Sequence, residues 1–155
     1  MNTVEVLTDD IDEPPWIDAL QRFGERVLRH LEYANWEASI LLCSDARIHG
    51  LNREYRGVDA PTDVLSFSQN TADVEPAGKP SPTFPISAGD IVISLDSAGR
   101  NAEQFKVSRE EELRRLTVHG LLHLAGYDHE SNERNEPMLM LQERILEELT
   151  EERLF

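Results

Sequence analysis

Cysteine and lysine are scarce in this 155-residue sequence, and acidic residues outnumber basic ones two to one. Cys43 is the only cysteine, so the chain can form no intramolecular disulfide and no thiolate cluster for a metal ion. Lys79 and Lys106 are the only lysines, so a site for an anion must be built from arginine guanidinium groups. The net charge of -15 argues against a general binder of polyanions, and we expect no DNA partner.

Long hydrophobic runs are missing as well. No apolar stretch approaches the roughly 20 residues that span a bilayer, and residues 1–10 lack the basic and apolar regions of a secretory signal. We therefore expect no membrane partner and a cytoplasmic location. With 39% hydrophobic and 29% charged residues, the chain has the composition of a globular protein. Its length predicts a single domain over residues 1–155.

Hydrophobic periodicity and turn residues predict alternating strands and helices in the first two-thirds of the chain and helices in the rest. The predicted strands are residues 3–7, 38–43, 62–68 and 91–95. The predicted helices are residues 16–31, a segment from Ser44 to Gly57, 96–105, 108–125, and a last helix that starts between Asn132 and Pro137. Residues 69–89 hold four of the eight prolines and two glycines, which favours a loop. Cys43 ends an apolar run, so we expect a small core residue on a strand.

The helix predicted from Ser108 matters most for function. Ser108 and Glu111 fit a capping box, and the helix is charged over residues 109–115 but almost uncharged over 116–125. Such a change is typical of a helix that runs from the surface into the middle of a domain. Gly126 is placed to end it.

Three of the five histidines, His119, His123 and His129, fall within eleven residues around this helix end. Residues four apart lie on one helical face, so His119 and His123 can bind the same ion. A chain reversal at Gly126 can bring in His129 as a third ligand. Three imidazoles leave a fourth tetrahedral position to water, which is the arrangement of a catalytic zinc.

A hydrogen-bonded core histidine is the ordinary alternative for a single histidine on an apolar helix. Three imidazoles in an otherwise uncharged segment would be costly without a shared partner, so we predict a metal site with one zinc ion per chain. His30 and His49 have no such neighbours, and we expect them to be ordinary surface or packing residues.

The histidine spacing is that of metzincin-type peptidases, with one difference. Those enzymes carry a general-base glutamate directly after the first histidine, where this chain has Gly120. Asp128 and Glu130 lie nearby in the sequence, but each can equally support a ligand by accepting a ring N–H. No general base can be assigned from the residues, which by themselves indicate a metallohydrolase with a three-histidine site.

Several blocks together resemble a known family. They are HGLLHLAGYDH over residues 119–129, LNREYRGVDAPTDVLSF over 51–67, GDIVIS over 89–94, and the register of Met138, Glu143 and Ile145 in the last helix. On these residues the chain resembles the YbeY family of bacterial endoribonucleases. Ser68 departs from the pattern, since the family often has proline there.

The resemblance implies an α+β fold in which helices surround a small mixed sheet, with the metal in a cleft on the HxxxHxxxxxH helix and turn, a zincin-like arrangement. It implies a zinc-dependent endoribonuclease specific for single-stranded RNA. The expected partners are ribosomal RNA and the small ribosomal subunit, because the family acts in maturation of the 3′ end of 16S rRNA and in ribosome quality control.

The family's functional arginine corresponds to Arg56. A guanidinium can hold a phosphate with two parallel hydrogen bonds and offset charge that develops on it. The residues alone leave open a structural role, in which Arg56 ties the helix end to Asp59 or Asp63; the resemblance favours the phosphate. The arginines that we expect to form a basic patch in the acidic surface are Arg47, Arg53, Arg56, Arg114 and Arg115.

Two alternatives remain from the sequence. One is a metallopeptidase, which the missing glutamate after His119 disfavours. The other is a non-catalytic ribosome assembly factor whose zinc is structural. A fourth protein ligand would favour the structural zinc, whereas a position left to water would favour catalysis.

Overall fold

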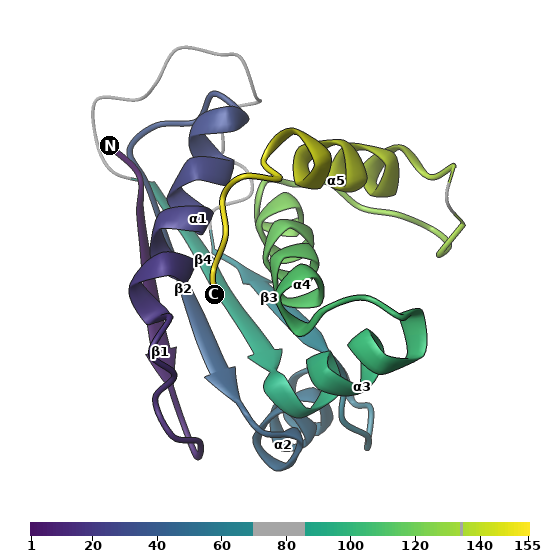
Figure 1. The fold of residues 1–155 in the computed structure, drawn as a ribbon. Helices are drawn as coiled ribbons and strands as arrows, with labels where there is room; N and C mark the ends of the chain where they lie inside the picture. The colour runs from purple at the N-terminus through teal and green to yellow at the C-terminus, as the bar shows by residue number, and fades with distance from the viewer. Residues whose placement is uncertain (70–85, 134) are drawn as a thin grey trace.

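The computed structural model describes residues 1–69, 86–133 and 135–155 (Figure 1). Within these ranges the strands are β1 (Thr3–Thr8), β2 (Trp36–Cys43), β3 (Val64–Ser68) and β4 (Ile86–Ser94). The helices are α1 (Ile17–His30), α2 (Asp45–Arg56), α3 (Leu95–Phe105), α4 (Arg109–Leu124) and α5 (Pro137–Glu148). Pro137 occupies the first turn of α5, as predicted, because proline is pre-organised for that position.

The four strands form one mixed sheet in the order β1-β2-β4-β3. β1 and β4 both run parallel to β2, while β3 runs antiparallel to β4 and forms an edge of the sheet. This sheet and its helices confirm the predicted α+β class with a small mixed sheet.

The helices cover the sheet unequally. Figure 1 shows α1 and α4 across one face, with α5 beside α4. Successive side chains of β4 point to opposite faces of the sheet. Ile91 and Ile93 belong to the main core under α1 and α4, whereas Val92 packs in a smaller cluster with Cys43 and Ile48 of α2. Cys43 is fully buried on β2, so the prediction of a core residue on a strand is confirmed.

One predicted boundary is wrong. Residues 86–89 belong to β4, which begins opposite Trp36 of β2, and not to the loop predicted over residues 69–89. The small residues Ser87, Ala88 and Gly89 give little strand signal, and pairing with β2 overrides it. The rest of that predicted loop, residues 70–85, lies outside the described residues.

No helix in the described part of the chain is long and apolar enough to cross a membrane.

Candidate metal centre

Helix α4 begins as its sequence predicts. The Ser108 hydroxyl accepts a hydrogen bond from the Glu111 backbone N–H at 3.0 Å, which satisfies one of the unpaired donors at the helix start. The helix then runs against β3 and β4, and its buried leucines secure it there, each contributing about 1.5–3 kcal/mol on burial. Near its C-terminal end, a half-buried side of the helix carries His119 and His123 toward a cavity beside β3.

The chain reverses directly after α4. The Gly126 N–H donates to the His123 carbonyl and the Tyr127 N–H donates to the Leu122 carbonyl, both at 3.0 Å, and Gly126 has a φ of +96°. This is the Schellman arrangement, which favours glycine because the left-handed backbone conformation strains residues with a Cβ. The turn returns the chain toward the helix and brings His129 beside the other two histidines.

The three histidines converge on one point. Nε2 of His119 lies 3.1 Å from Nε2 of His123, and one ring nitrogen from each of the three residues lies within 4.8 Å of the others. Nδ1 of His129 is 2.8 Å from the carbonyl oxygen of Ser131, which accepts its hydrogen bond. Nε2 of His129 therefore carries no proton in the neutral ring and remains a lone-pair donor. The grouping that the sequence predicted is present.

The environment favours the protonation state that binds metal. Burial lowers the pKa of both His119 and His123 below the usual histidine value, and for His123 the neighbouring imidazoles lower it further. Neutral imidazole is the form that coordinates a metal. Three neutral nitrogen donors at this spacing fit a borderline-soft ion such as zinc and do not fit Mg²⁺.

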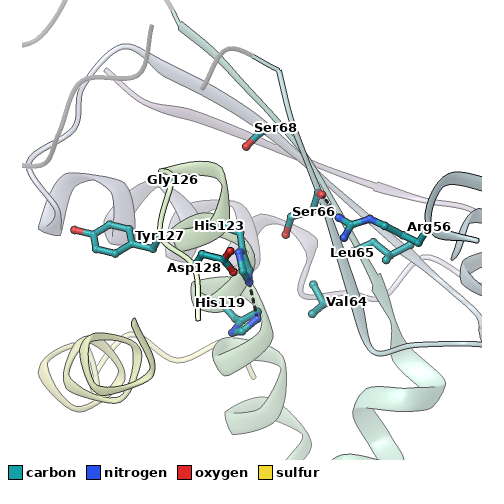
Figure 2. A pocket seen from close by; sticks show the side chains of 10 residues that line it. All are labelled: Arg56, Val64, Leu65, Ser66, Ser68, His119, His123, Gly126, Tyr127 and Asp128. Atoms are coloured by element: carbon teal, nitrogen blue, oxygen red, sulfur yellow. Dashed lines mark hydrogen bonds between the residues drawn. The ribbon is translucent and has the colours of Figure 1, made fainter. Parts of the chain in front are cut away.

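A cavity of about 420 Å³ lies between the C-terminal end of α4 and the strand β3 (Figure 2). His119 and His123 form one wall, and Arg56 lies across from them on the far side of β3. The lining residues are Arg56, Val64, Leu65, Ser66, Ser68, His119, His123, Gly126, Tyr127 and Asp128. The cavity is therefore mixed in polarity, with a guanidinium opposite the imidazoles.

Arg56 reaches this cavity from the last turn of α2. Its Nη2 donates to the backbone carbonyl of Ser66 at 2.9 Å, and its guanidinium lies 5.9 Å from the centre of the Phe67 ring. Neither carboxylate proposed as its structural partner holds it. Asp59 contacts His49 and Arg53, and Asp63 accepts from Asn101.

The predicted patch of five arginines is wrong. Arg56 is the one arginine that lines the cavity within the described ranges. Arg47 pairs with Asp9 at 2.8 Å, and Arg115 pairs with Glu143. Arg114 is only 6% exposed, because it donates to the Leu149 carbonyl at 2.6 Å inside the core. Among the described arginines, the cavity beside the histidines therefore receives one guanidinium, that of Arg56, whereas Arg47, Arg114 and Arg115 are engaged in contacts elsewhere.

The support of the histidine rings also differs from the prediction. Asp128 accepts a hydrogen bond from the backbone N–H of His129 at 2.8 Å and not from a ring. His119 is supported instead by Gln142 of α5, whose Oε1 lies 2.8 Å from Nδ1. The sequence held a signal for this residue, since Gln142 is a polar residue within the apolar stripe of the last helix.

The remaining two histidines lie elsewhere, as predicted. His30 lies 3.3 Å from Glu148, and His49 lies 2.8 Å from Asp59. Neither belongs to the three-histidine group.

The fold and the site define a class, that of α+β proteins with a histidine group able to hold a metal ion beside a cavity. The sequence profile of the family described as Endoribonuclease YbeY matches residues 3–150. The chain belongs to the YbeY family of endoribonucleases, which confirms the predicted family and enzyme class.

Individual relatives agree. A protein named Endoribonuclease YbeY from Treponema denticola is 49% identical over 138 residues, covering 87% of this chain and 86% of its own. A protein of the same name from Treponema pallidum is 44% identical over 146 residues, covering 94% of this chain and 89% of the relative. Another from Brevibacillus brevis is 42% identical, covering 96% of this chain and 98% of the relative. A solution structure of a protein from Thermotoga maritima superposes with a TM-score of 0.63 at 29% identity, covering 96% of this chain and 90% of that one.

Proposed function

We propose that residues 1–155 form one domain that cleaves single-stranded RNA with the help of a zinc ion. In this proposal it acts in the cytoplasm on ribosomal RNA of the small subunit, in maturation of the 16S rRNA 3′ end and in ribosome quality control. The observation that carries the proposal is the convergence of three imidazole nitrogens beside a cavity that is lined by two of these histidines, His119 and His123, and by the guanidinium of Arg56.

His119, His123 and His129 would hold the ion, one per chain. A bound zinc ion supplies Lewis acidity toward a phosphoryl oxygen and lowers the pKa of a coordinated water toward about 7. In the described part of the chain the group has three members and no fourth His, Cys, Asp or Glu. Three protein ligands are typical of a catalytic zinc, which supports hydrolysis over the structural zinc of an assembly factor.

Arg56 would hold the phosphodiester. One of its N–H groups is used by the Ser66 carbonyl, which fixes the guanidinium at the cavity edge. Within residues 1–69, 86–133 and 135–155 the other donors of Arg56 make no further hydrogen bond, so they can form two parallel bonds to phosphate oxygens. The Phe67 ring lies beside the guanidinium and limits its movement. The histidine site and Arg56 would therefore bind a phosphate between them.

The cavity also supports the choice of single strands. Its volume of about 420 Å³ is near the small end of ligand sites, so it admits one segment of backbone with its sugar. A flexible single strand can bend one phosphodiester into such a cavity, whereas a duplex holds its backbone in a fixed helical path. The net charge of -15 further disfavours binding an intact duplex along its length.

A peptidase activity is disfavoured at position 120, where metzincin-type peptidases carry the glutamate that acts as general base and this chain has glycine. Gly120 faces β4, and a Cβ there would lie 2.8 Å from the Ile91 side chain. The site therefore lacks both the carboxylate and the room for it.

The test is cleavage of one labelled RNA that contains a loop and a stem. We expect wild-type protein to cut the loop, and we expect His123→Ala protein and chelated wild type to lose the cleavage. His30→Ala, purified in the same way, is the matched control and should cut like wild type. Equal cleavage by all four samples would reveal a contaminating ribonuclease and would favour the assembly-factor alternative.

A further inference from the structure

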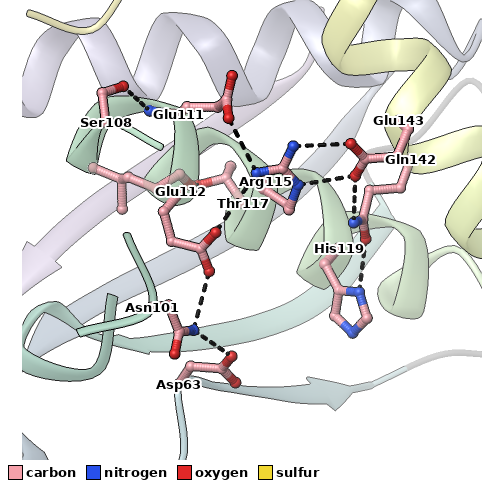
Figure 3. Close-up of polar contacts among 11 residues, drawn as sticks. Asp63, Asn101, Ser108, Glu111, Glu112, Arg115, Thr117, His119, Gln142 and Glu143 are labelled. Atoms are coloured by element: carbon pink, nitrogen blue, oxygen red, sulfur yellow. Dashed lines mark hydrogen bonds and ion pairs between the residues drawn. The ribbon is translucent and has the colours of Figure 1, made fainter. Parts of the chain in front are cut away.

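Gln142 is a buried polar side chain in contact with a histidine of the site. It is 6% exposed, although glutamine is mostly found at protein surfaces. Its Oε1 lies 2.8 Å from Nδ1 of His119 (Figure 3). Nε2 of the same ring faces His123. Helix α5 thus holds the His119 ring on the side away from the metal position.

The contacts around Gln142 fix which way its amide points. Its Nε2 lies 3.1 Å from Oε2 of Glu143, and an ionised carboxylate only accepts hydrogen bonds. Arg115 donates to both oxygens of this carboxylate, from Nε at 2.9 Å and from Nη2 at 2.8 Å. The same paired bonds raise the pKa of Arg115 above its usual value. The amide nitrogen must therefore face Glu143, and the amide oxygen must face His119.

The ion pair itself is anchored on α4. Nη1 of Arg115 lies 3.6 Å from a carboxylate oxygen of Glu111 and from one of Glu112, so two residues of its own helix hold the guanidinium that binds Glu143 of α5. Glu112 in turn accepts from Asn101 of α3 at 3.0 Å. Figure 3 shows these contacts as one path between the body of the fold and the His119 ring.

We propose that Gln142 is a positioning residue for the metal centre and that Arg115 and Glu143 act through it. An acceptor opposite Nδ1 requires a proton there, which leaves the lone pair of His119 on Nε2, the nitrogen that faces His123. Gln142 thereby selects both the tautomer and the orientation of the ring. This inference rests on the proposed three-histidine metal site.

The first measurement is zinc affinity, by competition with a chelator. Gln142→Leu keeps the size of the side chain but removes the acceptor, and we expect zinc to bind about 10- to 100-fold more weakly. Glu143→Gln should weaken binding less, since an oxygen remains to accept from Gln142. Glu147→Gln makes the same change one turn further along α5 and should leave the affinity unchanged.

A second control separates positioning from general destabilisation. Gln21 of α1 also uses its Oε1 in one hydrogen bond, from the Val6 N–H at 3.1 Å, away from the histidines. Gln21→Leu should lower the melting temperature without changing zinc affinity. In the double variant Gln142→Glu, Glu143→Gln, residue 142 still offers an acceptor to His119, and only the donor in its contact with residue 143 moves to residue 143. We therefore expect its zinc affinity to lie closer to wild type than that of Gln142→Leu.

The second measurement needs no metal. Nitrogen-15 NMR of the histidine rings in zinc-free protein should show His119 as the Nδ1–H tautomer in wild type and a mixture of tautomers in Gln142→Leu. An unchanged tautomer in Gln142→Leu, or zinc affinity equal to wild type, would overturn the positioning role. A wild-type protein that binds no zinc would instead overturn the proposed metal site, while the tautomer measurement would still decide the role of Gln142.

Discussion

Gly120 of α4 lies directly against Ile91 of β4, so that a Cβ on residue 120 would come within 2.8–3.0 Å of three atoms of the Ile91 side chain. Real Cβ atoms essentially never approach so closely. The helix that carries the histidines therefore packs on the sheet at a distance that only glycine allows here.

From this contact we predict that Gly120→Ala lowers the free energy of unfolding by about 1–3 kcal/mol, because the extra methyl overpacks the core. Gly50→Ala is the matched control: Gly50 lies in α2 with nothing within 4 Å of its added Cβ. There the substitution should stabilise the protein by about 0.4–1 kcal/mol. Denaturant unfolding measures the free energy of unfolding of both variants. Equal effects of the two substitutions would contradict the prediction and show that α4 can shift to accept the methyl group.

We predict a ratio of close to one zinc ion per chain in protein that was purified without any chelator. His119→Ala, His123→Ala and His129→Ala should each lose most of it, because each removes one of three ligands. His30→Ala and His49→Ala should keep it. Elemental analysis measures the ratio, and a value near zero in wild type with no uptake of added zinc would contradict the site.

We predict that Arg56→Ala keeps its melting temperature and zinc content but cleaves RNA more slowly by a factor on the order of 10², the scale for loss of one group that stabilises transition-state charge. Arg56→Lys should recover part of the rate, since an ammonium keeps the charge but not the paired hydrogen bonds. Arg53→Ala, one turn earlier on α2, is the control and should cleave normally. A fall of many degrees in the melting temperature of Arg56→Ala would mean that its bond to Ser66 is structural.

We predict that Cys43 is unreactive in the folded protein. Burial, with the negative charge of Asp10 adding to it, raises the pKa of its thiol to about 12, so the reactive thiolate is scarce at neutral pH. Alkylation should be at least about tenfold slower in native than in denatured protein, and Cys43→Ala should retain zinc. Rapid labelling of native protein, or zinc loss from a folded variant, would refute this.

We predict that Glu110 stabilises the fold in a pH-dependent way. Burial alone would raise the pKa of Glu110, but hydrogen bonds from the Phe155 and Leu154 backbones and the charge of Arg153 outweigh it and hold the pKa below 4.5. The pKa of Glu110 is therefore lower in the folded than in the unfolded protein. At a pH above the unfolded-state pKa, ionised Glu110 contributes to the free energy of unfolding. This contribution is lost as the pH falls through the folded-state pKa.

Glu110→Gln should therefore cost about 1–3 kcal/mol at pH 7, because Leu154 and Arg153 lose an ionised partner. The difference from wild type should shrink below about pH 4.5. Urea unfolding at several pH values measures it. A difference that stays constant down to pH 3 would mean that the charge of Glu110 contributes nothing.

Local patterns were enough to predict most helices and strands and the histidine group. His119 and His123 share a face because a helix repeats every 3.6 residues. The turn that brings in His129 depends on one glycine, Gly126, two residues after the end of α4. Such features arise from neighbours in the chain, so a sequence displays them directly. The start of β4 was missed because its small residues pair with β2, a contact that no local pattern records.

The surroundings of the site were decided by tertiary structure alone. Gln142 supports His119 from 23 positions away in the sequence, and Arg56 uses a backbone carbonyl of Ser66, which has no signature in a side-chain pattern. The sequence by itself determined which imidazoles can meet, because their spacing obeys helix geometry. Only the packing of α5 on α4 and of α2 beside β3 decided which groups orient those imidazoles and which of the described arginines lines the cavity next to them, because such contacts depend on the path of the whole chain.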